Sequence, residues 1–380
     1  MNLLGIIAEY NPFHNGHKYQ IQESKKDLNP DATVVVMSGN FTQRGNFACY
    51  DKWTRTKCAL LNGADLVIEL PVTFATGSAE RFAFGGVYLL DKMGVKNISF
   101  GSESELSELK AIVKKLLSDN FCIDAPAETP YHIARQQAIG NNDTLSMPNN
   151  ILATEYLKAL QILNSDVIPH RIKRFGTGYN DMTINNGIAS ATKVRDMIKN
   201  GYEITDVVPN NIYDILNKSD FVSDEKIFNN IKYSIISKNT NELANYAHIR
   251  EGIENRIYKC AFSANSLEDL IKEIKSKRYT YTSVSRMLIS ILLGIKKDQL
   301  SDNPGYIRVL GLNDTGARAL KHIKKNCSLP VITKVTSVDS LTGSALQDLE
   351  IDIKASDIYY TCAGYSTPSR PDYNNSPIKI

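Results

Sequence analysis

Three residues near the N-terminus have the types and spacing needed to bind a phosphate chain. His14, Gly16 and His17 follow an apolar run, residues 3–8, which is too short for a helical period and is typical of a buried parallel strand. An Asn-Pro pair ends the strand, and a helix can begin just after it. The N-terminus of such a helix offers free backbone N–H groups and a positive dipole end to an anion. We therefore predict a nucleotide site here, in which the imidazoles stabilise charge that develops at an attacked α-phosphorus.

The spacing of these residues resembles the HxGH signature of the nucleotidyltransferase superfamily, which includes class I aminoacyl-tRNA synthetases and small adenylyltransferases. Gly16 lacks a Cβ, so we expect that the backbone or a purine can approach closely there. The alternative is a pair of surface histidines in an Asn-Pro turn. The strand–loop–helix context favours the nucleotide interpretation.

A second element with anion-binding chemistry lies far along the chain. Ser190 and Thr192 stand at a predicted helix start, with Lys193 and Arg195 just inside it, so hydroxyls, backbone N–H groups and cations converge. In the HxGH superfamily a Ser/Thr-x-[IV]-R element binds the triphosphate, and residues 192–195 fit it. By itself the stretch could also be a capped amphipathic helix.

The elements that position these residues alternate between strands and helices. This alternation predicts an α/β fold with an N-terminal, Rossmann-like, doubly wound parallel sheet of the HxGH nucleotidyltransferase type. A mainly helical C-terminal region with a small α/β element (306–335) should follow, and a Pro-, Ser- and Asn-rich tail from residue 366 should be mobile. We expect a catalytic domain over 1–200 and a tRNA-binding region over 201–380. The predicted strands are 3–8, 31–37, 65–70, 97–100 and 167–174, and the predicted helices between them include 51–62, 76–90, 105–117 and 151–163, with a partly helical insertion at 119–142.

Several polar residues at the ends of these elements have two interpretations. Arg44, in a loop after the second strand, could bind a phosphate or carboxylate, or it could be solvated. Lys52 and Arg55 share a helix face and could bind phosphate or form a solvated stripe. Asn149 or Asn150 could cap a helix or bind a base or ribose.

Basic and aromatic residues alternate in the C-terminal half, as binding to RNA requires. The alternative without RNA binding is a helix-capping loop. A basic helix at 318–325 is another possible RNA-binding face. The candidate tRNA-binding residues are Lys275, Lys277, Arg278, Tyr279, Tyr281 and Arg286.

The composition of the chain limits the classes of partner and metal site that we expect. The net charge of +3 over 380 residues does not by itself indicate a nucleic-acid partner. The six cysteines form no CxxC pair, so we expect reduced thiols and no zinc site or other protein-bound metal. No apolar run approaches the ~20 residues of a membrane span, which predicts a cytoplasmic protein without a membrane partner.

Together, the blocks at residues 8–17, 37–45, 51–55, 62–67, 251–256 and 277–282 make the chain similar to the bacterial tRNA(Met) cytidine acetate ligase family. This resemblance covers nearly the whole chain. It implies that the protein activates acetate with ATP as acetyladenylate. It also implies acetyl transfer to the wobble cytidine of elongator tRNA(Met), which gives N4-acetylcytidine.

The resemblance also implies a set of ATP-binding residues, and Mg²⁺ is expected with the ATP. Where the family element reads Ser-Ser-Thr, this chain has Ser190-Ala191-Thr192 and therefore lacks one hydroxyl. We expect His14, His17, Lys193 and Arg195 to be catalytic. The expected ATP-binding residues are Ile7, Ala8, Glu9, Tyr10, Asn11, Pro12, Phe13, His14, Asn15, Gly16, His17, Lys18, Tyr19, Gln20, Gly101, Asn149 or Asn150, Arg174, Ser190 and Thr192.

Two other functions fit parts of the sequence. A small-molecule adenylyltransferase of the same superfamily would explain the first domain, but it would leave the basic stretch at 275–286 without a role. A non-catalytic RNA-binding protein would explain that stretch, but the intact histidine motif disfavours it.

Overall fold

The structure is a computed structural model of the whole chain. It describes residues 1–118, 121, 131–140, 143–174, 187–336, 338, 341–365 and 370–380. Most of the insertion expected at 119–142 lies outside these ranges, apart from residue 121 and the segment 131–140, which contains helix α6 (Tyr131–Ile139). A short 3₁₀ turn (Asp143–Ser146) comes after the insertion.

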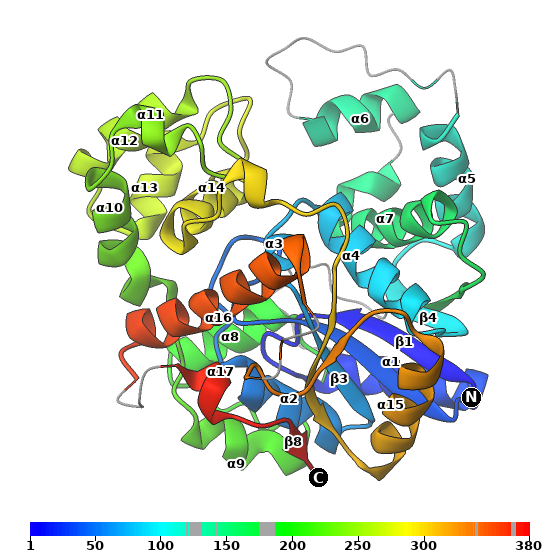
Figure 1. Cartoon of the computed structure of the whole chain (residues 1–380). Coiled ribbons are helices and arrows are strands. Elements are labelled where there is room, and N and C mark those ends of the chain that lie inside the picture. Colours follow the sequence, from blue (N-terminus) through cyan, green and yellow to red (C-terminus); the bar gives the residue numbers. More distant parts are fainter. Residues whose placement is uncertain are drawn as a thin grey trace.

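An eight-stranded sheet forms the centre of the molecule (Figure 1). Its order is β5-β4-β1-β2-β3-β6-β7, and β8 pairs with β6. Strands β1 to β5 form a parallel ladder, as predicted, whereas β6 joins β3 in the antiparallel direction. The strands are β1 (Leu3–Ala8), β2 (Ala32–Ser38), β3 (Leu66–Leu70), β4 (Asn97–Ser102), β5 (Ile168–Lys173), β6 (Ile307–Leu312), β7 (Val331–Ile332) and β8 (Ile378–Lys379).

The strand order reverses between β1 and β4, because β2 lies on one side of β1 and β4 on the other. In open α/β sheets the carboxyl ends of strands at such a point form a crevice where ligands bind. The HxGH residues follow β1, and Gly101 lies in β4. The topology therefore brings two of the predicted nucleotide elements to one edge of the sheet.

Helices cover both faces of the sheet, each with its own apolar core. Burial of these apolar surfaces is the main force that holds the layers together. One face carries α4 (Ala79–Lys92), α5 (Leu106–Leu116), α7 (Pro148–Ile162) and α15 (Asp314–Asn326), and the other carries α1 (Asn15–Leu28), α2 (Lys52–Leu61), α8 (Ala191–Lys199) and α9 (Asn210–Lys218).

A separate helical lobe, α10 to α14, stands beyond the sheet with its own core (Figure 1). Within the described chain, the expected small α/β element is part of the main sheet, so strands from both sides of residue 200 build it. The division at residue 200 otherwise stays a prediction. The lobe contains α10 (Phe228–Ile236), α11 (Thr240–Leu243), α12 (Ile253–Ser263), α13 (Leu267–Ile274) and α14 (Tyr281–Leu293).

The long helix α16 (Gly343–Ala363) packs against both α14 of the lobe and the short helix α3 (Val72–Ala75). None of the sequence features above predicts it, because buried aspartates interrupt its apolar pattern. Asp352 accepts a hydrogen bond from the backbone N–H of Val72 at 2.7 Å, and Asp348 accepts one from the Thr73 hydroxyl at 2.9 Å.

The expectation of a mobile tail is wrong for residues 370–380, although 366–369 lie outside the described part. A short helix, α17 (Pro371–Asn374), follows, and β8 pairs with β6. The side chain of Asp372 is fully buried, 2.8 Å from Lys52 Nζ. Polar composition suggested mobility, but the ionic contact with a distant helix fixes the segment.

Both interpretations of Lys52 and Arg55 are wrong, because the helix face that carries them is buried. Lys52 Nζ contacts Glu69 at 2.8 Å as well as Asp372. Arg55 donates to the carbonyl oxygens of Glu9 at 2.6 Å and Ser38 at 3.1 Å, where β1 and β2 end. Neither cation is available to a nucleotide, but Arg55 fixes the strand ends that carry the site.

Of the helices in the described ranges, none has the length and apolar composition to cross a membrane.

Candidate active site

The two histidines of the HxGH motif are held by the backbone around them. His14 caps the N-terminus of α1, and its Nδ1 accepts a hydrogen bond from the Gly16 N–H at 3.1 Å. His17 Nδ1 accepts from the His14 N–H at 3.3 Å. The imidazole rings stack with their centroids 3.7 Å apart, and the Tyr10 ring packs against His17 at 4.8 Å. Both side chains are therefore fixed before any ligand arrives.

Their environment keeps both imidazoles neutral. Burial, together with the nearby Arg174 and Arg195, lowers the pKa of His14 to about 3. Burial, His14 and Arg174 lower the pKa of His17 well below its usual value. Because each Nδ1 accepts a backbone hydrogen bond, the ring proton is on Nε2. The pair therefore offers directed N–H donors to a phosphate, whereas the positive charge comes from the arginines.

The space beside the Gly16 Cα is taken up by its own motif, and the approach of a purine there stays a prediction. A Cβ at this position would lie 2.9 Å from Cε1 of His14. The close approach is thus made by the imidazole of the same motif, and any larger residue would displace that ring.

A cavity of about 620 Å³ opens above the ends of β1 and β4. Its wall contains many of the residues that the sequence analysis assigns to ATP, but others of that set lie elsewhere. Asn15, for example, donates to the Gly187 and Asp206 carbonyls and fixes the start of α1. The expected residues that line the cavity are Ile7, Ala8, Glu9, Tyr10, Asn11, His14, His17, Gln20, Gly101, Asn149, Arg174, Ser190 and Arg195, and those outside the lining are Pro12, Phe13, Asn15, Gly16, Lys18, Tyr19, Asn150, Thr192 and Lys193.

The late element forms the start of α8, as predicted. Ser190 caps the helix by accepting from the Lys193 N–H at 3.1 Å. Arg195 donates to the Asn11 carbonyl at 2.6 Å and to the Thr192 hydroxyl at 3.2 Å, which aims its guanidinium at the motif after β1. The Lys193 ammonium lies 3.6 Å from Asp196 instead. The geometry therefore joins Arg195 and Ser190 to the histidines.

The two candidate asparagines have different environments, and neither caps a helix, because the residue before α7 is Met147. Asn150 is buried, and its Oδ1 accepts from the backbone N–H groups of Glu103 and Ser104 at 3.0 and 3.1 Å. Asn149 lines the cavity, where its Oδ1 accepts from Arg174 at 3.3 Å. The geometry favours Asn149 as the ATP contact, which stays a prediction.

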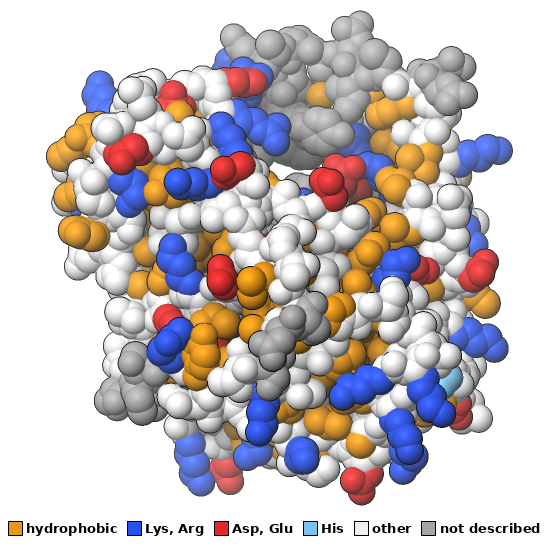
Figure 2. Space-filling model, viewed as in Figure 1, with side chains coloured by type: hydrophobic (Ala, Val, Ile, Leu, Met, Phe, Trp, Pro, Cys, Tyr) orange, Lys and Arg blue, Asp and Glu red, His pale blue; other side chains and the backbone are white. Residues whose placement is uncertain are grey.

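The basic stretch at 275–286 is divided between the cavity and the surface. Arg278 and Arg286 line the cavity, together with Thr280, Thr282 and Ser283. Arg278 is also exposed and ion-paired with Glu251 at 2.5 Å, whereas Lys275 and Lys277 are exposed and do not line the cavity. Tyr279 donates its hydroxyl to the Arg250 carbonyl at 3.1 Å and packs on the lobe. Figure 2 shows Lys and Arg side chains gathered at the inner edge of this lobe.

One charged pair in the cavity wall was not anticipated. Arg135 and Glu155 are both buried and ion-paired there. The only signal in the sequence is a carboxylate within the otherwise apolar helix at 151–163. Buried charges of this kind require a partner, and the partner comes from the inserted segment that carries α6.

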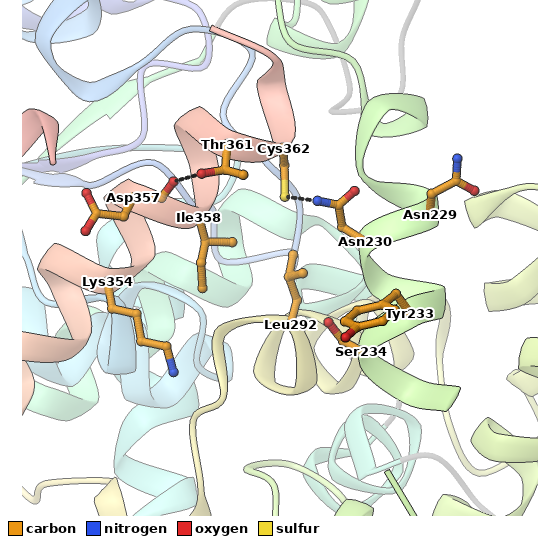
Figure 3. A pocket seen from close by; sticks show the side chains of 10 residues that line it. All are labelled: Asn229, Asn230, Tyr233, Ser234, Leu292, Lys354, Asp357, Ile358, Thr361 and Cys362. Carbon is orange, nitrogen blue, oxygen red and sulfur yellow. Dashed lines mark hydrogen bonds between the residues drawn. The ribbon is translucent and has the colours of Figure 1, made fainter. Parts of the chain in front are cut away.

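A second cavity, of about 470 Å³, lies between α10, α14 and α16 (Figure 3). Asn230 donates to the Cys362 thiol at 3.1 Å there. Its lining contains a lysine, Lys354, and an aspartate, Asp357, but no histidine or arginine. The lining residues are Asn229, Asn230, Tyr233, Ser234, Leu292, Lys354, Asp357, Ile358, Thr361 and Cys362.

Within the described ranges, no group of three or more His, Cys, Asp or Glu residues could hold a metal ion. The cysteines described there (49, 58, 260, 327 and 362) are free thiols, and Cys122 lies outside the described part.

Known proteins resemble this chain over nearly its whole length. Residues 1–373 match the family model described as HIGH Nucleotidyl Transferase. A Clostridium perfringens (strain ATCC 13124) protein named tRNA(Met) cytidine acetate ligase is 42% identical over 408 residues, covering 100% of this chain and 99% of the relative. A protein of the same name from Thermoanaerobacter sp. (strain X514) is 40% identical, with 100% of both chains covered.

Two solved structures are also similar over the full length. Thermotoga maritima TmcAL in its apo form I has a TM-score of 0.91 and 29% identity, covering 100% of both chains. The same protein bound with alpha-thio ATP (form II) has a TM-score of 0.89 and 29% identity, covering 100% of this chain and 99% of that one.

Proposed function

This chain belongs to the HIGH nucleotidyl transferase family and, within it, to the tRNA(Met) cytidine acetate ligases, and from that premise we propose the reaction that its cavity performs. ATP and acetate react to give acetyladenylate and pyrophosphate. The acetyl group then passes to the wobble cytidine of elongator tRNA(Met), which becomes N4-acetylcytidine, and AMP is released.

In the first step, an acetate oxygen attacks the α-phosphorus of ATP and the bond to pyrophosphate breaks. Positioning and charge stabilisation supply most of the rate in such a transfer. The Nε2–H groups of His14 and His17 donate to the phosphate oxygens where charge develops. Arg195 and the capped start of α8 hold the pyrophosphate that leaves, and Lys193 is proposed to assist from the same turn.

We place the nucleoside end of ATP toward β4. Gly101, Asn149 and Arg174 line the cavity on that side. Arg174 donates a hydrogen bond to Asn149, and its charge helps to lower the pKa of His14. Mg²⁺ would be bound by the triphosphate and water, because the described residues present no metal-ligand cluster of their own.

In the second step, the exocyclic amine of cytidine attacks the acetyl carbonyl, AMP leaves and the amine loses a proton. The base must leave its stack to reach the anhydride. The cavity allows this, because its lining runs from the histidines to the helical lobe at Arg278 and Arg286. That continuity between the HxGH motif and the basic stretch is the single observation that best supports a tRNA-directed transfer.

The test is pyrophosphate exchange with and without acetate, followed by mass analysis of tRNA nucleosides. We expect acetate-dependent exchange and a cytidine heavier by one acetyl group. Exchange that depends on a phosphorylated acceptor would instead indicate a small-molecule adenylyltransferase, and the absence of any exchange would indicate a binding protein.

We predict that Lys277→Ala combined with Arg278→Ala weakens tRNA affinity by roughly tenfold, because exposed cations supply phosphate contacts. The plot of log affinity against log salt should become shallower by about 0.7 for each phosphate that is no longer neutralised. Filter binding at several salt concentrations measures both effects, and acetate-dependent exchange should persist.

The matched control is Lys272→Ala, which removes an exposed lysine of the same lobe that does not line the cavity and is ion-paired with Glu268 at 2.6 Å, as Arg278 is with Glu251 at 2.5 Å. Unchanged tRNA affinity in the double variant at physiological salt would remove these residues from the binding surface.

A further inference from the structure

The wall of the active-site cavity contains two arginines, Arg44 and Arg286, from segments that pack against each other. Arg44 lies in the loop after β2, and Arg286 lies in the second turn of α14. The ATP-binding element after β1 includes neither of them. Their guanidinium groups are therefore candidates for binding a different anion.

The loop backbone beside Arg44 packs directly on the helix that carries Arg286. Gly45 has a φ of +76°, and a Cβ there would lie 2.5 Å from the backbone nitrogen of Arg286 and 2.6 Å from the Ser285 carbonyl carbon. Only glycine allows that contact. The same loop is tied to the end of β1, since the Gln43 N–H donates to Glu9 at 2.6 Å. The contact therefore joins the catalytic strand to the helical lobe.

Two like charges that lie close together repel each other, and an anion bound between them relieves the repulsion. Burial and Arg44 lower the pKa of Arg286 to about 10. In the described part of the chain, the Arg286 guanidinium has no carboxylate partner. Thr280, Thr282 and Ser283 line the cavity beside it and add hydroxyl donors. The arrangement is typical of an anion subsite.

The triphosphate is not the anion that fits this subsite. The cations that act most strongly on His14 are Arg174 and Arg195, and Arg174 also acts on His17. Acetate must lie next to the α-phosphorus, which places it with the histidines. The remaining anion in the reaction is the backbone of the RNA that brings the cytidine.

We propose that Arg44 and Arg286 bind the phosphodiester linkage beside the target cytidine and so position its base for acetyl transfer. This proposal rests on the proposed function. It separates a contact at the acceptor nucleotide from the outer tRNA contacts of Lys275 and Lys277.

The first test compares Arg286→Gln and Arg44→Gln with Arg250→Gln, which removes an exposed arginine of the lobe that does not line the cavity. We expect acetate-dependent pyrophosphate exchange to persist in the two cavity variants while acetyl transfer to tRNA falls at least tenfold. Arg250→Gln should leave transfer within twofold of wild type. Equal losses in all three variants would overturn the proposal in favour of general attraction.

The second test neutralises the linkage itself with a methylphosphonate on either side of the target cytidine in ligated tRNA. With the wild-type enzyme, a methylphosphonate at one of the two positions should lower acetyl transfer as much as Arg286→Gln does. When that methylphosphonate is combined with Arg286→Gln, acetyl transfer should fall no further. Additive losses would overturn the proposal. A raised KM for acetate in the exchange reaction of Arg286→Gln would also overturn it, because the pair would then bind acetate.

Failure of the proposed function has a different result. In that case wild-type enzyme would show no acetylated cytidine with any tRNA, whether or not the linkage is neutral.

Discussion

His14→Ala and His17→Ala are each expected to lower acetate-dependent pyrophosphate exchange by roughly 100-fold to 1,000-fold, the usual effect of removing a donor aimed at developing charge. Both imidazoles are neutral and present Nε2–H toward the cavity, because each Nδ1 accepts a backbone hydrogen bond. Exchange assays on the purified variants measure the loss. tRNA affinity should be retained, since the proposed outer tRNA contacts are on the helical lobe.

Amide substitutions separate the two nitrogens of the ring. His14→Asn can still accept from the Gly16 N–H and cap α1, but it has no donor at the Nε2 position. His14→Gln carries an amide N–H closer to that position and should keep more exchange than His14→Asn. A folded histidine variant that lost tRNA binding would contradict the separation of the two sites.

Lys52→Met is expected to reduce the free energy of unfolding by about 3–5 kcal/mol, the usual cost of breaking a buried ion pair. The side chain of Lys52 is fully buried between Glu69 and Asp372, at 2.8 Å from each. Its removal leaves two buried carboxylates with Arg308 as their remaining cation. Urea unfolding of wild type and variant measures the difference.

The matched control is Lys57→Met on the exposed side of the same helix, which should change stability by less than about 0.5 kcal/mol. A loss below about 1 kcal/mol for Lys52→Met would show that the cluster adds little stability.

The cluster also predicts that the protein loses stability in acid. Burial raises the pKa of Asp372, but Lys52 and Arg308 outweigh burial and lower it overall. Its contribution is therefore present above the unfolded pKa of about 4 and is lost as pH falls through the folded value.

The sequence alone determined the local chemistry of this protein. The apolar run at 3–8 followed by the HxGH residues predicted a strand, a turn and a helix start, and all three are present. The same holds for Ser190 at the start of α8. These features depend on residues close together in the chain, where hydrogen-bonding partners and periodicity can be recognised directly.

Only the tertiary structure decided which polar residues line the cavity. Lys52 and Arg55 have the spacing of a phosphate-binding face, yet their partners come from distant strands and, for Lys52, from Asp372, 320 residues away. The same limit applies to Asn149 and Asn150, since Glu103 and Ser104 occupy the second of them. The pairing of Arg44 with α14 likewise arises from one glycine contact across the fold. A side chain's chemical type is encoded locally, but its burial and charge partners depend on the packing of segments that are remote in sequence.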